Sequence, residues 1–201
     1  MNQVNEGGFS FTKEIILEND RARMTPLSMD HLPDLLPISN QYPNLLQYSP
    51  SPFGTESKLK AYIQGAIDLR TVGQRYPFAV YDKKNRRLTG SSSYGNISEK
   101  DKRLEIGWTW IAPDQQQTGL NQAMKYLMLS YAFEQLNYQR VEFRVDDRNE
   151  QSKMALGKIG AHYEGTLRSH TVLENGTRRA TSCFSILCSE WPEIMEKLTA
   201  K

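Results

Sequence analysis

The spacing of apolar residues along the chain alternates between the helical and the strand period, which predicts helices packed on a sheet. After Thr55, apolar residues recur at three- and four-residue intervals, the pattern of an amphipathic helix that Gly73 would end. A similar pattern predicts a helix over residues 121–136, and a shorter helix is expected over residues 149–159. The apolar residues of the first two helices are Leu59, Tyr62, Ile63, Ala66 and Ile67, then Leu120, Ala123, Met124, Leu127, Met128 and Tyr131.

Short runs of apolar and β-branched residues predict the strands, which cover residues 21–27, 78–81, 88–97, 104–111, 140–145, 162–172 and 178–188. After the first strand, Ser28 would cap a short helix that Pro37 ends or kinks, and a proline-rich stretch from Tyr42 to Gly54 is expected to form a loop. The order β-α-α-β-β-β-α-β-α-β-β predicts a mixed α/β (α+β) sheet fold. We expect one domain over residues 1–201, with residues 1–15 loosely ordered.

Composition indicates the class of protein but says little about its function. The 201 residues are 38% hydrophobic and 24% charged, which is typical of a globular chain with a sizeable core. A formal net charge of +2 gives no support for direct nucleic-acid binding, and the basic run at 83–87 is interpreted as a solvated turn. No apolar run approaches the ~20 residues that span a bilayer, and no signal peptide is visible, so we expect no membrane association.

The two cysteines, Cys183 and Cys188, are five positions apart and therefore lie on opposite faces of the last predicted strand. That geometry disfavours a disulfide, and two cysteines alone make no zinc site of ordinary spacing. We therefore expect no metal, and a reduced, cytoplasmic protein is the simplest interpretation.

The most informative segment is the polar turn between the strand at 104–111 and the helix at 121–136. A strand, a turn with one glycine and a helix start together present free backbone N–H groups, and the helix dipole favours an anion there. Lys125, one helical turn further on, either adds positive charge to this site or is a solvated helix lysine. The candidate binding residues of the turn are Gln116, Gln117, Thr118, Gly119, Leu120 and Asn121.

Three motifs, in this order along the chain, resemble the GNAT N-acetyltransferase superfamily. Leu104-Glu105-Ile106-Gly107-Trp108 is similar to the E-I-G-Y strand of its ribosomal-protein-acetyltransferase branch. The turn Gln116-Gln117-Thr118-Gly119-Leu120-Asn121 is similar to the family's Q/R-x-x-G-x-G/A turn, with Asn121 in place of the usual Gly or Ala. Asn149-Glu150-Gln151-Ser152, with the later runs Lys158-Ile159-Gly160-Ala161 and Glu164-Gly165-Thr166-Leu167-Arg168, resembles that branch's N-x-x-S … K-L-G-F … E-G-x-x-R pattern.

The resemblance implies a GNAT-like fold, with a central twisted, mostly antiparallel mixed sheet of about seven strands flanked by about four helices. It also implies acetyl-CoA as cosubstrate. The pyrophosphate of coenzyme A suits the N–H groups of the turn. Its pantetheine amides can pair with strand backbone around Trp110, Ile111 and Ala112, and Asn149 is a further expected amide partner.

Acetyl transfer to an amine needs a base, because an alkylamine is mostly protonated at pH 7. Glu105 is the first candidate. The alternatives are that Glu105 is a half-buried strand residue paired with Arg103 or Lys102, or that it faces solvent. His170 is a further candidate base.

The leaving thiolate needs a proton or a hydrogen bond, and Ser152 is the candidate donor. Its alternative role is structural, since Asn149 is a good N-cap and Ser152 would lie in the first turn of the helix that follows.

Three functions remain to be weighed. The first is an acetyltransferase whose acceptor is a protein N-terminus, as on a ribosomal protein, or a small amine. The second is a non-catalytic acyl-CoA-binding or sensor protein of the same fold. The third, a nucleotide-binding protein, is disfavoured because neither a Gly-Lys-Ser/Thr loop nor G-x-G-x-x-G occurs at the turn. We expect a monomer or a homodimer.

Overall fold

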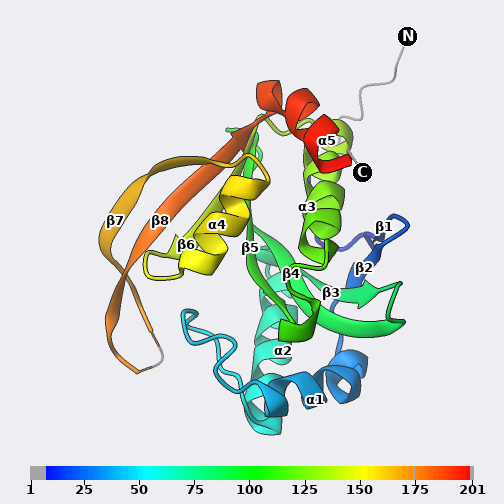
Figure 1. Ribbon diagram of the computed structural model, residues 1–201, viewed down its shortest axis with the longest axis vertical. Helices are drawn as coiled ribbons and strands as arrows, with labels where there is room; N and C mark the ends of the chain where they lie inside the picture. The colour runs from blue at the N-terminus through cyan, green and yellow to red at the C-terminus, as the bar shows by residue number, and fades with distance from the viewer. Residues whose placement is uncertain (1–7, 174, 200–201) are drawn as a thin grey trace.

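The computed structural model describes residues 8–173 and 175–199 (Figure 1). In this part of the chain eight strands form one sheet, in the order β1-β2-β3-β4-β5-β6-β8-β7. Neighbouring strands are antiparallel except β5 and β6, which are parallel. The strands are β1 Leu17–Glu18, β2 Ala22–Pro26, β3 Arg75–Asp82, β4 Arg87–Ser98, β5 Arg103–Ile111, β6 Arg140–Asp146, β7 His162–Val172 and β8 Arg178–Leu187.

Five α-helices cover the two faces of this sheet in the described residues. They are α1 Leu32–Gln41, α2 Glu56–Thr71, α3 Leu120–Ser130, α4 Glu150–Lys158 and α5 Trp191–Thr199. A π-helical turn, Tyr131–Gln135, continues α3. Short 3-10 turns, Met29–His31, Pro113–Gln115 and Cys188–Glu190, precede α1, α3 and α5.

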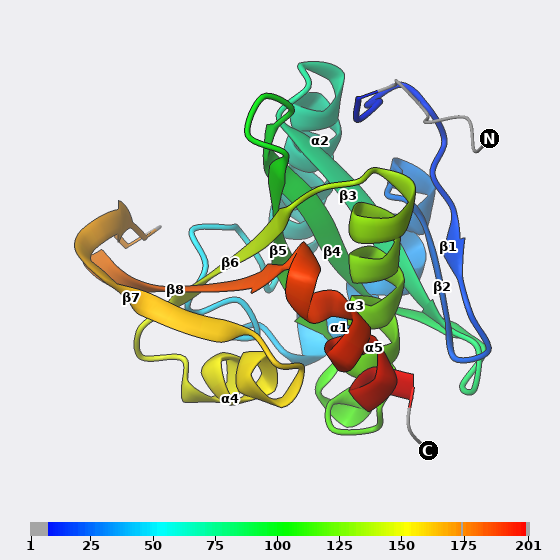
Figure 2. The same cartoon turned by 90° about the horizontal axis from the view of Figure 1, so that it is seen from above.

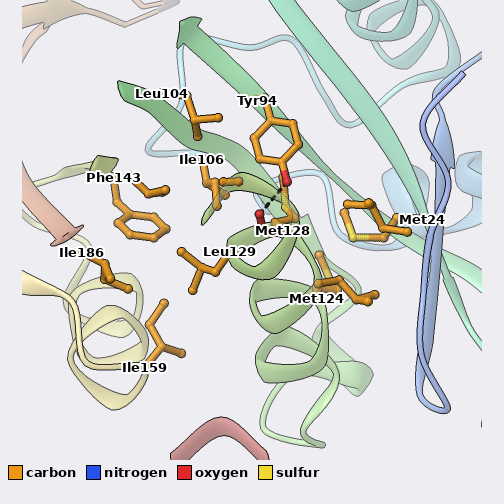
Figure 3. Packing of buried hydrophobic residues seen from close by; sticks show 14 of the residues in the cluster. Met24, Tyr94, Leu104, Ile106, Met124, Met128, Leu129, Phe143, Ile159 and Ile186 are labelled. Carbon is orange, nitrogen blue, oxygen red and sulfur yellow. Dashed lines mark hydrogen bonds between the residues drawn. The ribbon is translucent and has the colours of Figure 1, made fainter. Parts of the chain in front are cut away.

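Helices lie on both faces of the sheet (Figure 2), and one hydrophobic cluster on each face holds them against it. On the α3 face, Ile106 of β5, Phe143 of β6 and Leu129 of α3 belong to one cluster (Figure 3). The Tyr94 hydroxyl donates a 2.6 Å hydrogen bond to the Met128 carbonyl there, which fixes β4 to α3. The cluster on the other face joins α1 and α2 to the strands and includes Trp110 of β5.

Strands β5 and β6 pair over a short stretch and then separate. Their three paired positions are Arg103↔Arg140, Leu104↔Val141 and Glu105↔Glu142. Beyond them β6 continues to pair with β8 as far as Asp146, whereas β5 keeps only β4 as a strand partner. From Ile106 onward, β5 therefore has no strand beside it on its β6 side (Figure 1). We call this stretch the β5–β6 divergence.

The structure confirms the fold class and corrects several details. It has one strand and one helix more than expected, because β1 is two residues long and α5 begins where the strand pattern ends. Pro37 does not end its helix and lies inside α1. Buried Leu35 and Ile38 hold the helix on both sides of the proline, so packing overrides its local penalty.

The N-terminal segment is described from residue 8. Residues 8–15 form no helix or strand, but they pack on the sheet. Ile15 is 4% exposed, and the Phe9 ring lies 5.5 Å from that of Tyr76. The part of the expected loose segment before residue 8 lies outside the described residues.

Candidate functional site

The turn between β5 and α3 presents the free N–H groups that its sequence predicts. Gly119 is the N-cap residue of α3 and takes a left-handed conformation, with φ of 86°, and no side chain caps this helix. In the described structure, the N–H groups from Gln117 to Gln122 donate no hydrogen bond, and the first one used is that of Ala123 to Gly119. A ligand at this helix start would therefore meet several converging donors and the positive end of the helix dipole.

Residues distant in sequence support this turn. Arg21, just before β2, donates a 3.2 Å hydrogen bond to the Thr118 hydroxyl and forms an ion pair with buried Asp82. Asn85 donates a 2.6 Å hydrogen bond to the Gln115 side chain. Arg21 places a positive charge beside this turn, and sequence reasoning missed it because no local pattern links two residues 97 positions apart.

Gln116 reaches from the turn to the unpaired side of β5. Its side-chain amide donates a 3.3 Å hydrogen bond to the Ile111 carbonyl and accepts a 2.7 Å hydrogen bond from Gln151 at the start of α4. A side-chain amide thus bonds to a backbone carbonyl of β5, which is the kind of acceptor that an amide of pantetheine is expected to use. Trp110 and Ala112 pack in the α1–α2 cluster and Ile111 in the other, so this backbone is firmly held. Contact of Trp110, Ile111 and Ala112 with an acyl donor stays a prediction.

Glu105 stands where β5 and β6 part, as the last β5 residue paired with β6. It is 6% exposed, and the Asn96 amide donates a 2.6 Å hydrogen bond to its carboxylate. Arg144 forms a 3.4 Å ion pair with it. Burial raises the pKa of Glu105 above its ordinary value, against the opposing effects of Asn96 and Arg144.

The alternative in which Glu105 pairs with Arg103 or Lys102 was wrong. Arg103 pairs with Asp101 and Glu142, and Lys102 pairs with Glu99. Side chains alternate along β5, and its neighbours Leu104 and Ile106 point toward α3. Glu105 therefore faces the opposite side of the sheet.

The start of α4 holds the second pair of candidates. The Asn149 side-chain oxygen accepts a 3.0 Å hydrogen bond from the Ser152 backbone N–H, so Asn149 is the N-cap. Within the described structure, the Ser152 hydroxyl and the Asn149 NH₂ group make no hydrogen bond. Asn149 satisfies the cap, and the Ser152 hydroxyl remains available to a ligand.

Lys125 is buried, and no carboxylate of the described residues lies within ion-pair distance of its ammonium. It is 4% exposed and donates a 3.0 Å hydrogen bond to the Thr109 hydroxyl of β5. Its ammonium lies 5.5 Å from the centre of the Phe143 ring of β6. Burial lowers its pKa to about 7. The interpretation of Lys125 as a solvated helix lysine was wrong, because an apolar pattern alone does not reveal a polar residue that a fold buries.

The remaining candidates have ordinary surroundings. His170 is exposed, and its Nδ1 lies 3.1 Å from the Thr181 hydroxyl. Cys183 and Cys188 are free thiols, as expected. Among the described residues, no group of three or more His, Cys, Asp or Glu side chains is arranged to hold a metal ion. In the same residues, none of the helices is both long and apolar enough to cross a membrane.

Two surface hollows lie away from the turn. One, of about 450 Å³, lies between the loop that precedes α2 and the β7–β8 hairpin, with Phe53 and Leu173 in its lining. Arg179 of β8 donates a hydrogen bond to the Tyr48 carbonyl of that loop, which ties hairpin and loop together. The other, of about 730 Å³, is bounded by α1 and β2–β4 and contains none of the predicted site residues.

Comparison with known proteins identifies the family. The model of the acetyltransferase (GNAT) domain matches residues 21–162. The chain therefore belongs to the GNAT acetyltransferase family.

Individual relatives agree with this assignment. The chain is 27% identical over 120 residues to the uncharacterized N-acetyltransferase p20 of Bacillus licheniformis, a match covering 60% of this chain and 67% of that protein. The matches to curated relatives span between 56% and 67% of those proteins' lengths.

Two solved structures share the fold. A GCN5-related N-acetyltransferase from Brucella melitensis superposes with a TM-score of 0.85 at 25% identity, covering 96% of this chain and 87% of that one. The ribosomal-protein-S5-alanine acetyltransferase from Vibrio fischeri has a TM-score of 0.68 at 18% identity, covering 88% and 98%, which is a likeness of fold alone.

The residues present fit the cosubstrate that the family uses, acetyl-CoA. The unused N–H groups at the start of α3 suit a diphosphate. The unpaired side of β5 suits an amide-bearing chain, as the contact between Gln116 and Ile111 illustrates.

Proposed function

We propose that the protein transfers an acetyl group from acetyl-CoA directly to a primary amine. The observation that carries this proposal is the continuity of the site: free N–H donors at the start of α3 lead to the unpaired side of β5, which ends at buried Glu105. In this proposal Gln116 to Asn121 hold the diphosphate, and Trp110, Ile111 and Ala112 pair with the amide arm. The acyl donor supplies an activated thioester.

Glu105 is the proposed base. An alkylammonium cannot attack until it loses a proton, and a carboxylate whose pKa is raised toward neutrality is better matched to accept it than an ordinary one. Glu105 lies on the side of β5 away from α3, so the proton acceptor is separated from the helix start that would hold acetyl-CoA. The proton passes from the amine to the Glu105 carboxylate, directly or through one water.

Ser152 and Asn149 are the proposed partners of the thioester end. The free Ser152 hydroxyl would donate a hydrogen bond to the departing sulfur, and the free Asn149 NH₂ would donate to a pantetheine carbonyl. Both groups sit on a capped helix start, so they are held in place without using their donor atoms.

The acceptor is proposed to be a protein N-terminus. The motif resemblance to the ribosomal-protein branch, from Glu105 to Arg168, supports this choice. The two free thiols favour a reducing compartment, so we place the protein in the cytoplasm. A small amine is the alternative acceptor.

One observation favours a second function, acyl-CoA binding without turnover. Asn96 and Arg144 already engage the Glu105 carboxylate, as they would if Glu105 were purely structural. The two functions separate in one experiment, in which release of CoA thiol is followed with acetyl-CoA and a panel of ribosomal-protein N-terminal peptides and small amines.

Calorimetric binding of acetyl-CoA is measured beside the thiol-release assay. Binding with amine-dependent thiol release supports the transferase. Binding without release from any acceptor supports the sensor, and the absence of binding refutes both.

A further inference from the structure

Lys125 is a buried cation that the proposed reaction leaves without a role. An ammonium group has three hydrogen-bond donors and no acceptor. In the described structure, Lys125 makes one hydrogen bond, to the Thr109 hydroxyl, and no carboxylate lies within ion-pair distance of it. The Thr109 hydroxyl in turn lies 2.7 Å from the Ser92 hydroxyl of β4, so it already takes part in another hydrogen bond. Two of the three ammonium donors are unused.

Such a group is costly to bury, and in the described structure only the Thr109 hydroxyl and the face of the Phe143 ring compensate it. Thr109 of β5 and Phe143 of β6 contact the ammonium, and Ser92 of β4 bonds to the Thr109 hydroxyl; none of these three side chains is charged. Burial is the sole cause of its lowered pKa, with no contribution from any ionisable neighbour. A buried donor without a partner is stable only where the protein gains something from it, and a ligand that brings an acceptor is one such gain.

The position of Lys125 indicates which ligand brings the acceptor. Lys125 lies four residues after Asn121, which is about 6 Å along the axis of α3. Its two contacts, Thr109 and Phe143, lie on β5 and β6 beyond the last paired residues, Glu105 and Glu142. The ammonium therefore lies between the start of α3 and the point near Glu105 where β5 and β6 stop pairing. This position is beside the path proposed for the pantetheine arm.

We propose that Lys125 is a positioning residue for the acyl donor, whose ammonium donates a hydrogen bond to a carbonyl oxygen of the amide-bearing arm between β5 and β6. This inference rests on the proposed function. The carbonyl is the acceptor of choice because the arm carries two amides, and an ammonium can only donate.

Binding of the acyl donor then depends on the charge of Lys125. With a pKa of about 7, about half of the protein carries the ammonium at pH 7 and about 1% at pH 9. If the charged form alone makes the contact, the dissociation constant rises up to about 50-fold between these pH values. The 3′-phosphate of the donor ionises near pH 6, below this window, and so contributes little.

The test is calorimetric titration of the full chain with acetyl-CoA, without an amine, at pH 7, 8 and 9. We expect wild-type affinity to fall as the pH rises. Lys125→Met should bind at least ~10-fold more weakly at pH 7, because a charge-assisted hydrogen bond is lost, and its affinity should not change with pH. Lys197→Met, which alters an exposed lysine on α5, is the matched control and should behave as wild type.

Thermal unfolding of the same variants shows whether they fold. A folded-state pKa below the ordinary value means that the ammonium destabilises the fold below pH 7, and that this penalty fades as the pH rises toward 10.5. Lys125→Met should therefore unfold at a higher temperature than wild type at pH 7. Thr109→Val is the second variant. It removes the oxygen that orients the ammonium and should weaken binding while keeping the pH dependence.

The failures of the two proposals are distinguishable. Wild-type protein that is folded but binds no acetyl-CoA overturns the proposed function and this inference with it. Wild-type binding that does not change between pH 7 and pH 9, or Lys125→Met binding as tightly as wild type, overturns the role of Lys125 alone. A variant with unchanged affinity but slower turnover also overturns it, because the contact would then belong to the reacting sulfur rather than to the arm.

Discussion

The role of the turn before α3 can be tested by adding a single methyl group at Gly119. Its φ of +86° is left-handed, and a Cβ built there meets no atom within 4 Å. An alanine therefore does not clash, but it costs about 1–2 kcal/mol in this conformation. If the turn keeps its shape, the methyl group projects into the space through which a diphosphate would approach. If the turn relaxes instead, the N–H groups diverge, and restoring them on binding costs that same energy.

Both responses lower the affinity for acetyl-CoA, and 1–2 kcal/mol corresponds to about 5- to 30-fold in the dissociation constant. Gly119→Val should lower the affinity further, because a β-branched residue is less tolerant of positive φ. The matched control is Gly176→Ala in the β7–β8 hairpin, where φ is +79° and the space is equally open. We expect both alanine variants to lose up to about 8 °C in melting temperature, but only Gly119→Ala to bind more weakly in calorimetry. Equal affinities for Gly119→Ala and Gly176→Ala would refute the assignment of this turn to the diphosphate.

Three further substitutions test the chemistry. Glu105→Gln should lower kcat/KM most at low pH, where the amine depends on a base, and the deficit should shrink as the pH approaches the amine pKa; a deficit that is constant with pH removes Glu105 from proton transfer. Ser152→Ala should lower kcat by ~10-fold or more with an unchanged melting temperature, because the cap uses its backbone N–H; unchanged kcat returns Ser152 to a structural role. Gln151→Ala breaks the hydrogen bond to Gln116 and should speed acetyl-CoA association about 2- to 10-fold in stopped flow, whereas an unchanged rate shows that this contact does not limit entry.

Local sequence patterns predicted most of the fold because most elements depend on local signals. The amphipathic stripe that starts at Leu59 places α2 correctly, and the hairpin at Gly176 joins β7 and β8 as expected. Sequence patterns missed β1, whose two residues are too few for a period to be visible. The possibility that Pro37 ends its helix was wrong, because a proline signal is local and the packing of α1 against α2 is not.

The site was predictable where one segment carries it and unpredictable where the fold assembles it. The strand, turn and helix start around Gly119 follow from adjacent residues, so the free N–H groups at this helix start were predicted, whereas the left-handed N-cap at Gly119 is a finding of the structure. Arg21 reaches that turn from a position just before β2, and Arg144 reaches Glu105 from β6. Such contacts depend on which strands become neighbours, and no spacing in the sequence records that.

The two proposed functional groups, Glu105 and Lys125, lie on opposite faces of β5. Ser92 of β4 stands opposite two β5 residues, Trp108 and Thr109, and Trp108 has a φ of 50°, which together mark a β-bulge. Glu105 lies before the bulge and faces away from α3, whereas Thr109 lies after it and meets Lys125 of α3. A base on one face and a buried donor on the other can act on an acyl donor between β5 and β6 from opposite sides. Changes at Glu105 should therefore appear in kcat and changes at Lys125 in the dissociation constant, and a variant of either residue that moves both quantities equally would contradict this separation.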